Sequence, residues 1–248
     1  MLDHPYATRC ERDHQMLRAL AHRLLPAHCV VCQLGPGAQG AAICAPCEAD
    51  FFPVISRCPR CAISIAAALP DAAGFCGRCL AQLPNFDATL TLADYVSPVD
   101  GMVIAMKFTA RLDLANFFGR LLAQRSARAL SASKWIVVPV PLAFERMRER
   151  GFNQSLHIAK ALAAASGGRV AHDRLLRVRH TPPQQSLALN ERRRNVRGAF
   201  AVEGTLAGQS VFVVDDVMTS GSTLDEIARV LKQAGATHVH NLIVARTP

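Results

Sequence analysis

The sequence predicts an α/β fold, with a mostly parallel sheet flanked by helices, preceded by a small cysteine-rich module. Three observations support this prediction. Eight of the nine cysteines lie between Cys29 and Cys79. Beyond them, short β-branched runs alternate with helical stretches, which is typical of a parallel sheet with helices on its faces. The run 211–215 leads directly into a small polar loop and a helix, which is where ligands bind in such sheets.

Length and composition exclude several classes of protein. A chain of 248 residues, 50% hydrophobic and 19% charged, can bury a full core, so we expect neither intrinsic disorder nor a minimal disulfide scaffold. No stretch reaches the roughly 18 uninterrupted apolar residues of a membrane span, and the first residues lack the apolar segment of a secretory signal. We therefore expect a cytoplasmic protein, in which cysteines stay reduced and serve as ligands or core residues.

Charge divides the chain near the last of the clustered cysteines. Residues 1–95 hold 7 basic and 8 acidic side chains, whereas residues 96–248 hold 21 and 11. Within 144–197, 11 of the 12 basic side chains are arginine, whose planar fork suits phosphate and nucleic acid. The predicted domains are an N-terminal helical segment at 1–24, a metal module at 25–83 and an α/β domain at 84–248.

The eight clustered cysteines form four C-x2-C pairs. They are Cys29, Cys32, Cys44, Cys47, Cys58, Cys61, Cys76 and Cys79. Two thiolates two residues apart can occupy two corners of a tetrahedron, so four pairs predict two four-cysteine zinc sites, a double zinc ribbon. Four thiolates leave no open coordination position, so we expect the Zn2+ ions to be structural. An iron–sulfur centre would use the same ligands, but the even tandem pairing favours zinc.

Spacing leaves the grouping of these pairs open. Neighbouring pairs could share one zinc ion, or the pairs could interleave. The ninth cysteine, Cys10, and the early histidines have no matching spacing, so we interpret them as non-ligands.

Four strands and three helices are predicted beyond the cysteines. The β-branched runs lie at 88–95, 135–140, 211–215 and 238–245. Apolar residues recur at helical spacing near 113–130, 154–166 and 223–234. Gly167 and Gly235 follow two of these helices as expected C-caps.

The segment 211–235 is the most informative part of the sequence. Its strand ends in two acids and continues into a hydroxyl-rich loop, and these residues are Asp215, Asp216, Thr219, Ser220, Gly221, Ser222 and Thr223. Amides of a short glycine-containing loop at a helix N-terminus bind anions, whereas carboxylates accept hydrogen bonds from sugar hydroxyls or hold Mg2+. A sugar phosphate satisfies both halves. The Walker A lysine and the dinucleotide fingerprint are both missing from this segment.

A simpler interpretation is that the two acids only end a strand and that Thr219 or Ser222 only caps a helix. The ordered combination of strand, acids, hydroxyl-rich loop and helix favours the sugar phosphate.

This segment resembles the 5-phosphoribosyl-1-pyrophosphate (PRPP) loop of type I phosphoribosyltransferases. With the four cysteine pairs ahead of it, the chain from Cys29 to Thr247 resembles the ComF family, also called ComFC or GntX-like, of bacterial competence-associated proteins. Further matches are PVP at 139–141, RERGFNQS at 148–155, RHTPPQQSLALNERRRNVRGAF at 179–200 and IVART at 243–247. The resemblance implies a type I phosphoribosyltransferase fold for the domain that follows the zinc ribbons.

The resemblance also implies residues that bind PRPP. Asp215 and Asp216 would contact the ribose hydroxyls. The 5-phosphate would lie in a loop made of Met218, Thr219, Ser220, Gly221, Ser222 and Thr223. The diphosphate would lie against Val138, Pro139, Val140 and Pro141, neutralised by Arg148 and Arg150. This loop reads TSGST where TTGAT is the commoner family form, a change that keeps small and hydroxyl side chains.

Phosphoribosyl transfer passes through an oxocarbenium-like centre while pyrophosphate leaves, so catalysis depends on Mg2+, on arginines and on positioning. Asp215 or Asp216 would stabilise the positive sugar, or Asp216 would act as a base; the sequence does not choose. Asn153 or Ser155 either contacts the ligand or caps the helix that follows. Lys107 follows an apolar helical run, and we expect it to be a surface residue rather than a catalytic one.

Two functions follow from these patterns. One is an active phosphoribosyltransferase that uses PRPP and a nucleobase or another nitrogen nucleophile. The other is a protein that binds single-stranded DNA, with PRPP as a regulatory ligand and no transfer. The resemblance implies a role in natural transformation or the use of external DNA, alongside other competence proteins. The sequence identifies neither the acceptor base nor the oligomeric state.

The segment 179–197 is rich in Arg, Gln, Thr and Pro, and we interpret it as a loop that covers PRPP or contacts nucleic acid. The candidate nucleic-acid contacts are Arg179, Arg192, Arg193, Arg194 and Arg197. With only 2 Tyr and 1 Trp, base stacking would have to use phenylalanines or arginine planes.

Overall fold

The computed structural model describes residues 28–34, 42–65, 74–131, 134–179 and 195–248. The chain divides into two compact units, residues 1–50 and residues 51–248. The first holds the tetrad that begins at Cys29, and the second holds the tetrad that begins at Cys58 together with the sheet. The predicted segment 1–24 and Cys10 lie outside the described residues, and the predicted boundaries at 25–83 and 84–248 stay predictions.

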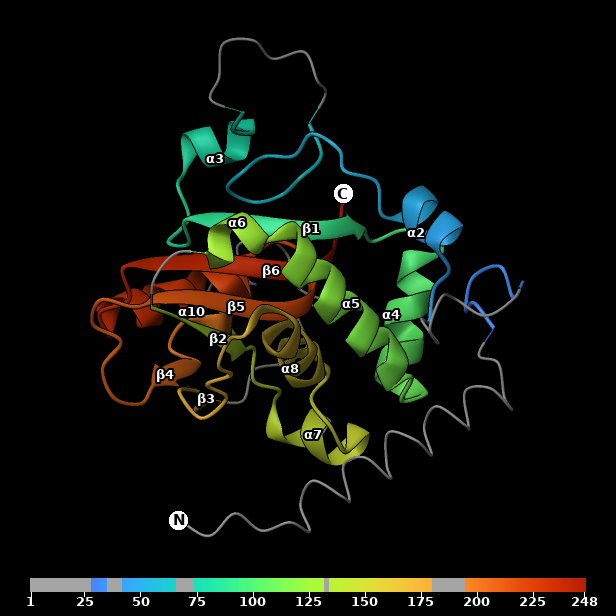
Figure 1. Cartoon of the computed structure of the whole chain (residues 1–248). Coiled ribbons are helices and arrows are strands. Elements are labelled where there is room, and N and C mark those ends of the chain that lie inside the picture. The colour runs from blue at the N-terminus through green and yellow to red at the C-terminus, as the bar shows by residue number, and fades with distance from the viewer. Residues whose placement is uncertain (1–27, 35–41, 66–73, 132–133, 180–194) are drawn as a thin grey trace, which may run out of the picture. The chain divides into compact units, whose positions relative to one another are not determined.

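A four-stranded parallel sheet forms the centre of the second unit (Figure 1). Its strands run in the order β1-β6-β5-β2, and every neighbouring pair is parallel. The strands are β1 (Ala88–Asp94), β2 (Trp135–Pro139), β5 (Ser210–Met218) and β6 (His238–Arg246). All four predicted strands are confirmed. β5 continues past the predicted end at 215, because Asp215 to Met218 keep pairing with β6.

The predicted helices are also present, with one subdivision. The stretch near 113–130 contains two helices, α5 (Leu112–Arg125) and the short α6 (Ala127–Leu130). The other two predictions correspond to α8 (Gln154–Ser166) and α10 (Ser222–Gln233). Gly167 is the left-handed C-cap of α8, whereas the C-cap of α10 is Ala234 and Gly235 follows it with φ +99°.

Several short elements were not predicted. They are α2 (Ala45–Phe51), α3 (Gly77–Ala81), α7 (Phe144–Arg150) and the antiparallel pair β3 (Leu175–Arg177) and β4 (Phe200–Val202). The apolar helical run before Lys107 is α4 (Val99–Phe108). The seven residues of α7 bury no side chain, so its sequence FERMRER carries no apolar periodicity. Strands of three residues are likewise too short for a period to be visible.

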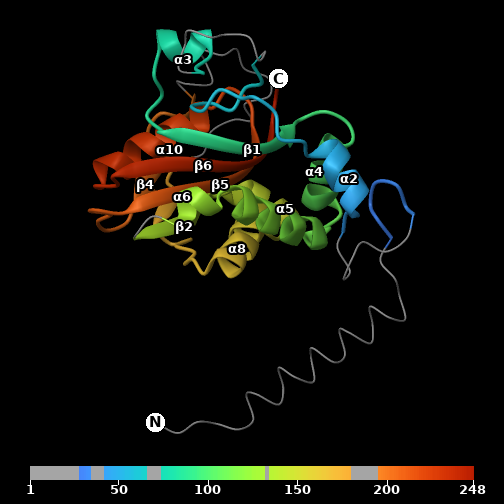
Figure 2. The same cartoon turned by 45° about the horizontal axis from the view of Figure 1, so that its top comes forward.

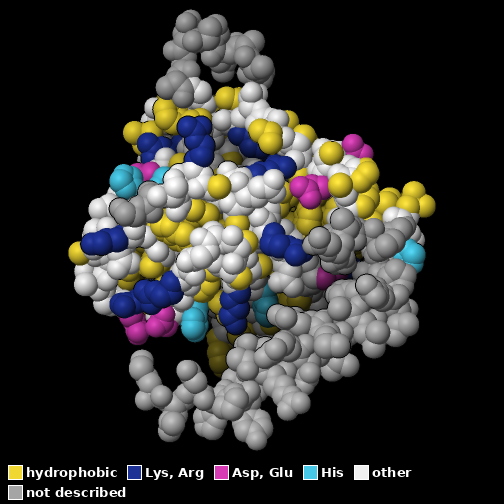
Figure 3. Space-filling model, viewed as in Figure 1, with side chains coloured by type: hydrophobic (Ala, Val, Ile, Leu, Met, Phe, Trp, Pro, Cys, Tyr) yellow, Lys and Arg dark blue, Asp and Glu magenta, His cyan; other side chains and the backbone are white. Residues whose placement is uncertain are grey.

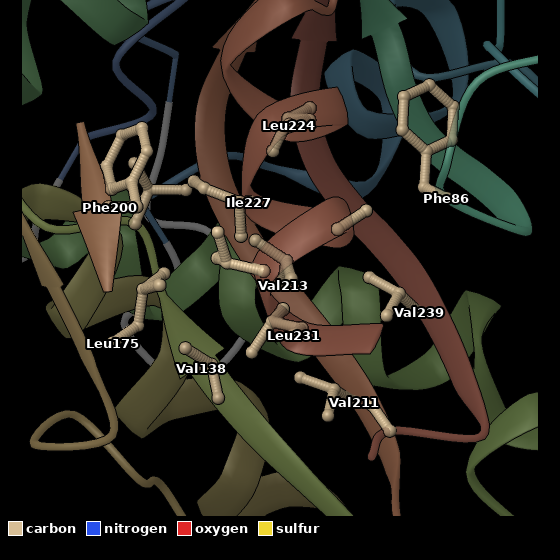
Figure 4. Close-up of a cluster of buried hydrophobic side chains, with 14 of the residues drawn as sticks. Phe86, Val138, Leu175, Phe200, Val211, Val213, Leu224, Ile227, Leu231 and Val239 are labelled. Carbon is tan, nitrogen blue, oxygen red and sulfur yellow. The ribbon is translucent and has the colours of Figure 1, made fainter. Parts of the chain in front are cut away.

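The two faces of the sheet are covered by different helices (Figure 2). Successive strand residues point to opposite faces, and Val211 and Val213 of β5 pack with Ile227 and Leu231 of α10 in one buried cluster (Figure 4). The helices α5 and α8 pack against the other face. At the C-terminal end of β5, polar side chains from two helices, α8 and α4, reach the strand.

Helices α5 and α8 approach closely at Gly119, where no side chain intervenes. A Cβ at this position would come 2.5 Å from the Cβ of Ala161 and 2.6 Å from the carbonyl oxygen of Ile158. Glycine is required here by the close approach of two backbones.

Among the helices that the structure describes, none combines the length and the apolar character needed to cross a bilayer.

Replacing Gly119 with alanine should lower the free energy of unfolding by about 1–3 kcal/mol, because the new methyl group forces α5 and α8 apart. Gly101→Ala is the matched control: this exposed helical glycine has no heavy atom within 4 Å of the added Cβ. Alanine there should stabilise α4 by about 0.5–1 kcal/mol. Urea denaturation measures both, and equal stabilities of the two variants would contradict the packing argument.

Candidate functional site

The eight clustered cysteines form two tetrads of neighbouring pairs. The first tetrad is Cys29, Cys32, Cys44 and Cys47, and the second tetrad is Cys58, Cys61, Cys76 and Cys79. Within each, the ligand sulfurs all lie within 4.8 Å of one another. The grouping that spacing left open is thereby settled in favour of neighbouring pairs.

The two tetrads repeat the same local backbone. In the first pair of each, the amide that follows the second cysteine donates to the carbonyl oxygen of the first cysteine, from Gln33 and from Ala62. Both of these residues have positive φ, 56° and 57°. The amides of Cys44 and Cys76 each donate to the first sulfur of their tetrad, at 3.4 Å. Such amide-to-sulfur bonds are typical of metal-binding knuckles, which hold thiolates.

The charges of the second tetrad favour a cation at its centre. Burial alone raises the pKa of Cys58, but hydrogen bonds from the amides of Cys76 and Cys61 outweigh it and lower the pKa to about 7. Burial, then hydrogen bonding to Cys61 and its charge, raise the pKa of Cys79. A thiolate therefore hinders ionisation of its neighbours, and a bound metal ion removes that conflict.

The separation of the sulfurs suits a tetrahedral metal ion. The Sγ atoms of Cys32 and Cys44 lie 3.7 Å apart, and those of Cys61 and Cys76 lie 3.5 Å apart. Zinc bonds of 2.3 Å in a tetrahedron place sulfurs about 3.8 Å apart. Both tetrads could therefore each hold a metal ion.

The two acids of β5 are held by different elements. Asp215 Oδ1 accepts a hydrogen bond from Ser155 Oγ at 2.9 Å and another from the amide of Asp216 at 3.0 Å. Asp216 is 4% exposed, and its Oδ2 lies 3.0 Å from Nζ of Lys107. That oxygen has the ion pair but no well-aligned hydrogen bond. The structure therefore leaves a buried carboxylate oxygen that a ligand or cation can engage.

The two carboxylates cannot both ionise easily. Burial, then the charge of Asp216, raise the pKa of Asp215 to about 7, although Ser155 and Lys107 oppose the shift. Asp215 consequently changes its protonation state near neutral pH. A cation between the two carboxylates would reverse the shift.

The 219–223 loop joins β5 to α10. Gly221, with φ +79°, is the N-cap of α10 and makes no side-chain hydrogen bond, and the amide of Ser222 donates to Oγ of Ser220 at 3.3 Å. The hydroxyls of Ser220 and Ser222 lie 2.9 Å apart and are buried, whereas Thr219 is exposed. Met218 is buried beneath the loop, and a Cβ on Gly221 would come 2.5 Å from its Cε. The loop therefore depends on glycine for its shape.

The segment predicted to hold a diphosphate is anchored to the protein. Val140 donates its amide to the carbonyl of Val214 at 3.0 Å and accepts from the side chain of Asn153 at 3.0 Å. The N–H and the C=O of Val140 are thus both hydrogen-bonded, and Pro139 and Pro141 have no backbone N–H that could bind a phosphate. Beside this segment is a mostly apolar cavity of about 230 Å3, lined in part by Leu142 and His172.

Arg148 and Arg150 each lie over an exposed aromatic ring. The guanidinium of Arg148 is 5.9 Å from the ring of Phe144, and that of Arg150 is 5.3 Å from the ring of Phe108. Phe108 and Phe144 are 73% and 72% exposed. Arg150 also bonds Oε1 of Gln154 at 2.5 Å. The charge of Asp216 acts on Arg150 and opposes the lowering of its pKa by burial.

Asn153, Ser155 and Lys107 lie near the two carboxylates and have different roles. Asn153 is the N-cap of α8, and its side chain accepts from the amide of Ser155 at 3.0 Å. Ser155 bonds Asp215 and belongs to the site. The prediction of Lys107 as a surface residue was wrong, because its side chain is 20% exposed and pairs with Asp216. The apolar run before Lys107 was expected to be helical, but its pairing with a distant carboxylate is not visible in the sequence.

The candidate nucleic-acid residues are only partly described. Arg179 is exposed and donates to the carbonyl oxygens of Asn195 and Arg197 at 2.9 and 2.6 Å. The amide of Gly198 donates to Glu226 of α10 at 2.7 Å. These bonds hold the two ends of the arginine-rich segment together. The other candidates, Arg192, Arg193 and Arg194, lie outside the described residues.

Comparison with known proteins agrees with this architecture. The model of the phosphoribosyl transferase domain matches residues 119–248. Three of the four strands, β2, β5 and β6, together with the paired acids and the glycine-capped loop, thus belong to a phosphoribosyltransferase domain.

Curated relatives narrow the assignment. The chain is 34% identical over 228 residues to the DNA utilization protein YhgH of Salmonella typhimurium, covering 90% of this chain and 98% of that protein. It is 28% identical over 227 residues to Competence protein F of Haemophilus influenzae, covering 88% and 96%. It is 29% identical over 130 residues to Competence protein ComFC of Bacillus subtilis, covering 52% and 51%. The chain therefore belongs to the ComF family of phosphoribosyltransferase-domain proteins.

The raised pKa of Asp215, about 7, predicts a pH-dependent difference in stability. An acid with a raised pKa in the folded state binds more protons folded than unfolded, so stability falls as pH rises. Wild type should lose stability relative to Asp215→Asn between about pH 5 and about pH 8, by on the order of a few kcal/mol. Urea denaturation measures the difference, and a constant difference over this range would contradict the raised pKa.

Proposed function

We propose that the protein binds PRPP with Mg2+ at the C-terminal end of β5 and transfers its phosphoribosyl group to a nitrogen nucleophile. The observation that carries the proposal is the sequence of two adjacent carboxylates followed by a glycine-capped helix N-terminus. The amides and hydroxyls of the 219–223 loop bind the 5-phosphate, and Asp215 and Asp216 accept hydrogen bonds from the ribose hydroxyls.

The diphosphate of PRPP lies next to α7 in this proposal. Because the backbone of Val140 is already paired, the positive charge for the diphosphate comes from Arg148 and Arg150. Lys107 joins them once a ligand or cation takes its place beside Asp216. Mg2+, when bound, neutralises the leaving diphosphate. The chain's own residues hold the sugar and leave one face of its anomeric carbon open to a nucleophile.

Transfer breaks the bond between the anomeric carbon and the diphosphate oxygen and forms a bond to nitrogen, with pyrophosphate and a proton as the other products. Asp215 and Asp216 stabilise the positive charge that develops on the sugar. The 230 Å3 cavity beside Pro139 and Pro141 is the proposed place for a planar acceptor. Each tetrad is proposed to hold one structural Zn2+ ion, because four thiolates leave no coordination position for a substrate.

Asp215→Asn combined with Asp216→Asn should reduce PRPP affinity in Mg2+ below detection by calorimetry, because neutral amides accept hydrogen bonds from the ribose hydroxyls more weakly than carboxylates do. Asp113→Asn serves as a control, since that carboxylate lies at the start of α5 in an exposed pair with Arg111. Unchanged PRPP affinity in the double variant would overturn the sugar-phosphate assignment. Pyrophosphate release with PRPP and a panel of nucleobases then separates a transferase from a protein that only binds PRPP.

A second candidate function, binding of single-stranded DNA, is favoured by the two arginine-covered phenylalanines. Aromatic rings and guanidinium planes both stack on bases, and Phe108 and Phe144 supply exposed rings with Arg150 and Arg148 over them. Figure 3 shows Lys and Arg side chains interspersed with hydrophobic ones on the face in view. The names of two relatives refer to DNA utilization and to competence. In this alternative PRPP is a regulatory ligand.

Phe144→Ala should weaken binding of an oligothymidylate by about tenfold, because one stacking surface is lost. Leu83→Ala is the control, because Leu83 is 64% exposed but aliphatic. Fluorescence anisotropy measures both affinities at a fixed salt concentration. Equal affinities of the two variants would remove the stacking argument for this function.

A further inference from the structure

The second tetrad lies directly against the 219–223 loop. Arg78 occupies the position between its ligands Cys76 and Cys79, on the short helix α3. From there its Nη2 donates a hydrogen bond to the backbone carbonyl of Ser220. A residue inside a metal-binding C-x2-C pair thus holds the backbone of the candidate phosphate site.

A second arginine joins the same two features from the other end of the chain. Arg246, which is 4% exposed, donates from Nε to the carbonyl of Cys61 at 3.1 Å and from Nη1 to the carbonyl of Met218 at 3.2 Å. Just beyond α3, Asn85 donates its amide and its side chain to Asp225 in the first turn of α10, at 2.6 and 3.0 Å. Three polar links therefore join the second tetrad and its flank to the 219–223 loop and to the residues on either side of it.

These bonds orient the peptide groups of the loop. In a trans peptide the carbonyl and the following amide point in opposite directions. Arg78 holds the carbonyl of Ser220, so the amide of Gly221 points away from the second tetrad. Arg246 holds the carbonyl of Met218, so the amide of Thr219 also points away from Arg246. The gap between tetrad and loop measures about 20 Å3, room for about one water molecule. The ligand therefore lies on the opposite side, where the amides point.

The position of Arg78 depends on the metal site. The amide of Cys76 donates to the sulfur of Cys58 at 3.4 Å, and Cys61 and Cys79 are buried in the same cluster as Leu224 of α10. Four sulfurs within 4.8 Å of one another repel as thiolates unless a cation lies between them. Loss of the metal would therefore move α3 and release the carbonyl of Ser220.

We infer that Arg78 is a positioning residue through which metal bound at the second tetrad sets the affinity of the 219–223 loop for a phosphate ligand. The inference rests on the proposed binding of PRPP. The first tetrad belongs to the other compact unit and has Pro46 at the position equivalent to Arg78, so it supplies a matched control within the same chain.

The primary test replaces the exposed Arg78 with glutamine in the full-length, zinc-loaded protein. Elemental analysis should still find a metal ion in each tetrad, while PRPP affinity measured by calorimetry in Mg2+ falls by about tenfold, the effect of losing one charge-assisted hydrogen bond. Arg78→Lys retains a charged donor and should recover affinity to within about threefold of wild type.

A second experiment removes metal ligands from each tetrad in turn and compares the effects on PRPP affinity. Replacing Cys76 and Cys79 with serine should remove one metal ion and weaken PRPP at least as much as Arg78→Gln does. Adding Arg78→Gln to that variant should cause little further loss, since the two changes act on one interaction. Replacing Cys44 and Cys47 with serine should also remove one metal ion but leave PRPP affinity unchanged.

Hydrogen exchange without ligand separates this inference from the proposed function. The amides of the 219–223 loop should exchange faster in Arg78→Gln than in wild type. If wild type fails to bind PRPP but the loop amides respond, the proposed function is wrong and the positioning role holds. Exchange at the wild-type rate in Arg78→Gln, or an equal loss of PRPP affinity from either tetrad, would overturn the inference.

Discussion

Two adjacent carboxylates near the end of β5 impose the constraint on which the surrounding structure depends. Burial and the charge of Asp216 raise the pKa of Asp215, so the two acids cannot both ionise without partners. α8 supplies Ser155 for one and α4 supplies Lys107 for the other. Side chains from two different helices are therefore needed to balance the charge of the site. A structural role alone would be served better by apolar residues, which is why the pair indicates a ligand.

In the cysteine tetrads, too, groups of like charge lie close together and hinder each other's ionisation. Each gathers four sulfurs within 4.8 Å, and the pKa values of Cys58 and Cys79 shift in opposite directions as a result. The second tetrad is also part of the hydrophobic core of its unit, because three of its cysteines belong to the cluster that α10 completes. Arg78, which lies between Cys76 and Cys79, donates to the carbonyl of Ser220 and so joins this tetrad to the 219–223 loop.

Much of the fold was predictable because its strands and long helices have clear periods. The β-branched runs of β2 and β5 and the apolar spacing of α8 and α10 identified them within a few residues. α7 was missed for a physical reason: it buries no side chain and shows no one-sided stripe. α4 was expected only as an apolar helical run before Lys107, without bounds. Lys107 was misjudged, since its role depends on a partner 109 positions further along the chain.

The sequence by itself determined which chemical groups are present and their order: four cysteine pairs, two acids, a glycine-containing loop and an arginine-rich segment. It also determined the family, because that order is specific. Only the tertiary structure decided which cysteine pairs share a site, that Ser155 and Lys107 meet the two acids, and that Arg78 and Arg246 reach the carbonyls of the loop. The physical reason is that these contacts join residues distant in sequence, and their geometry follows from packing rather than from any local period.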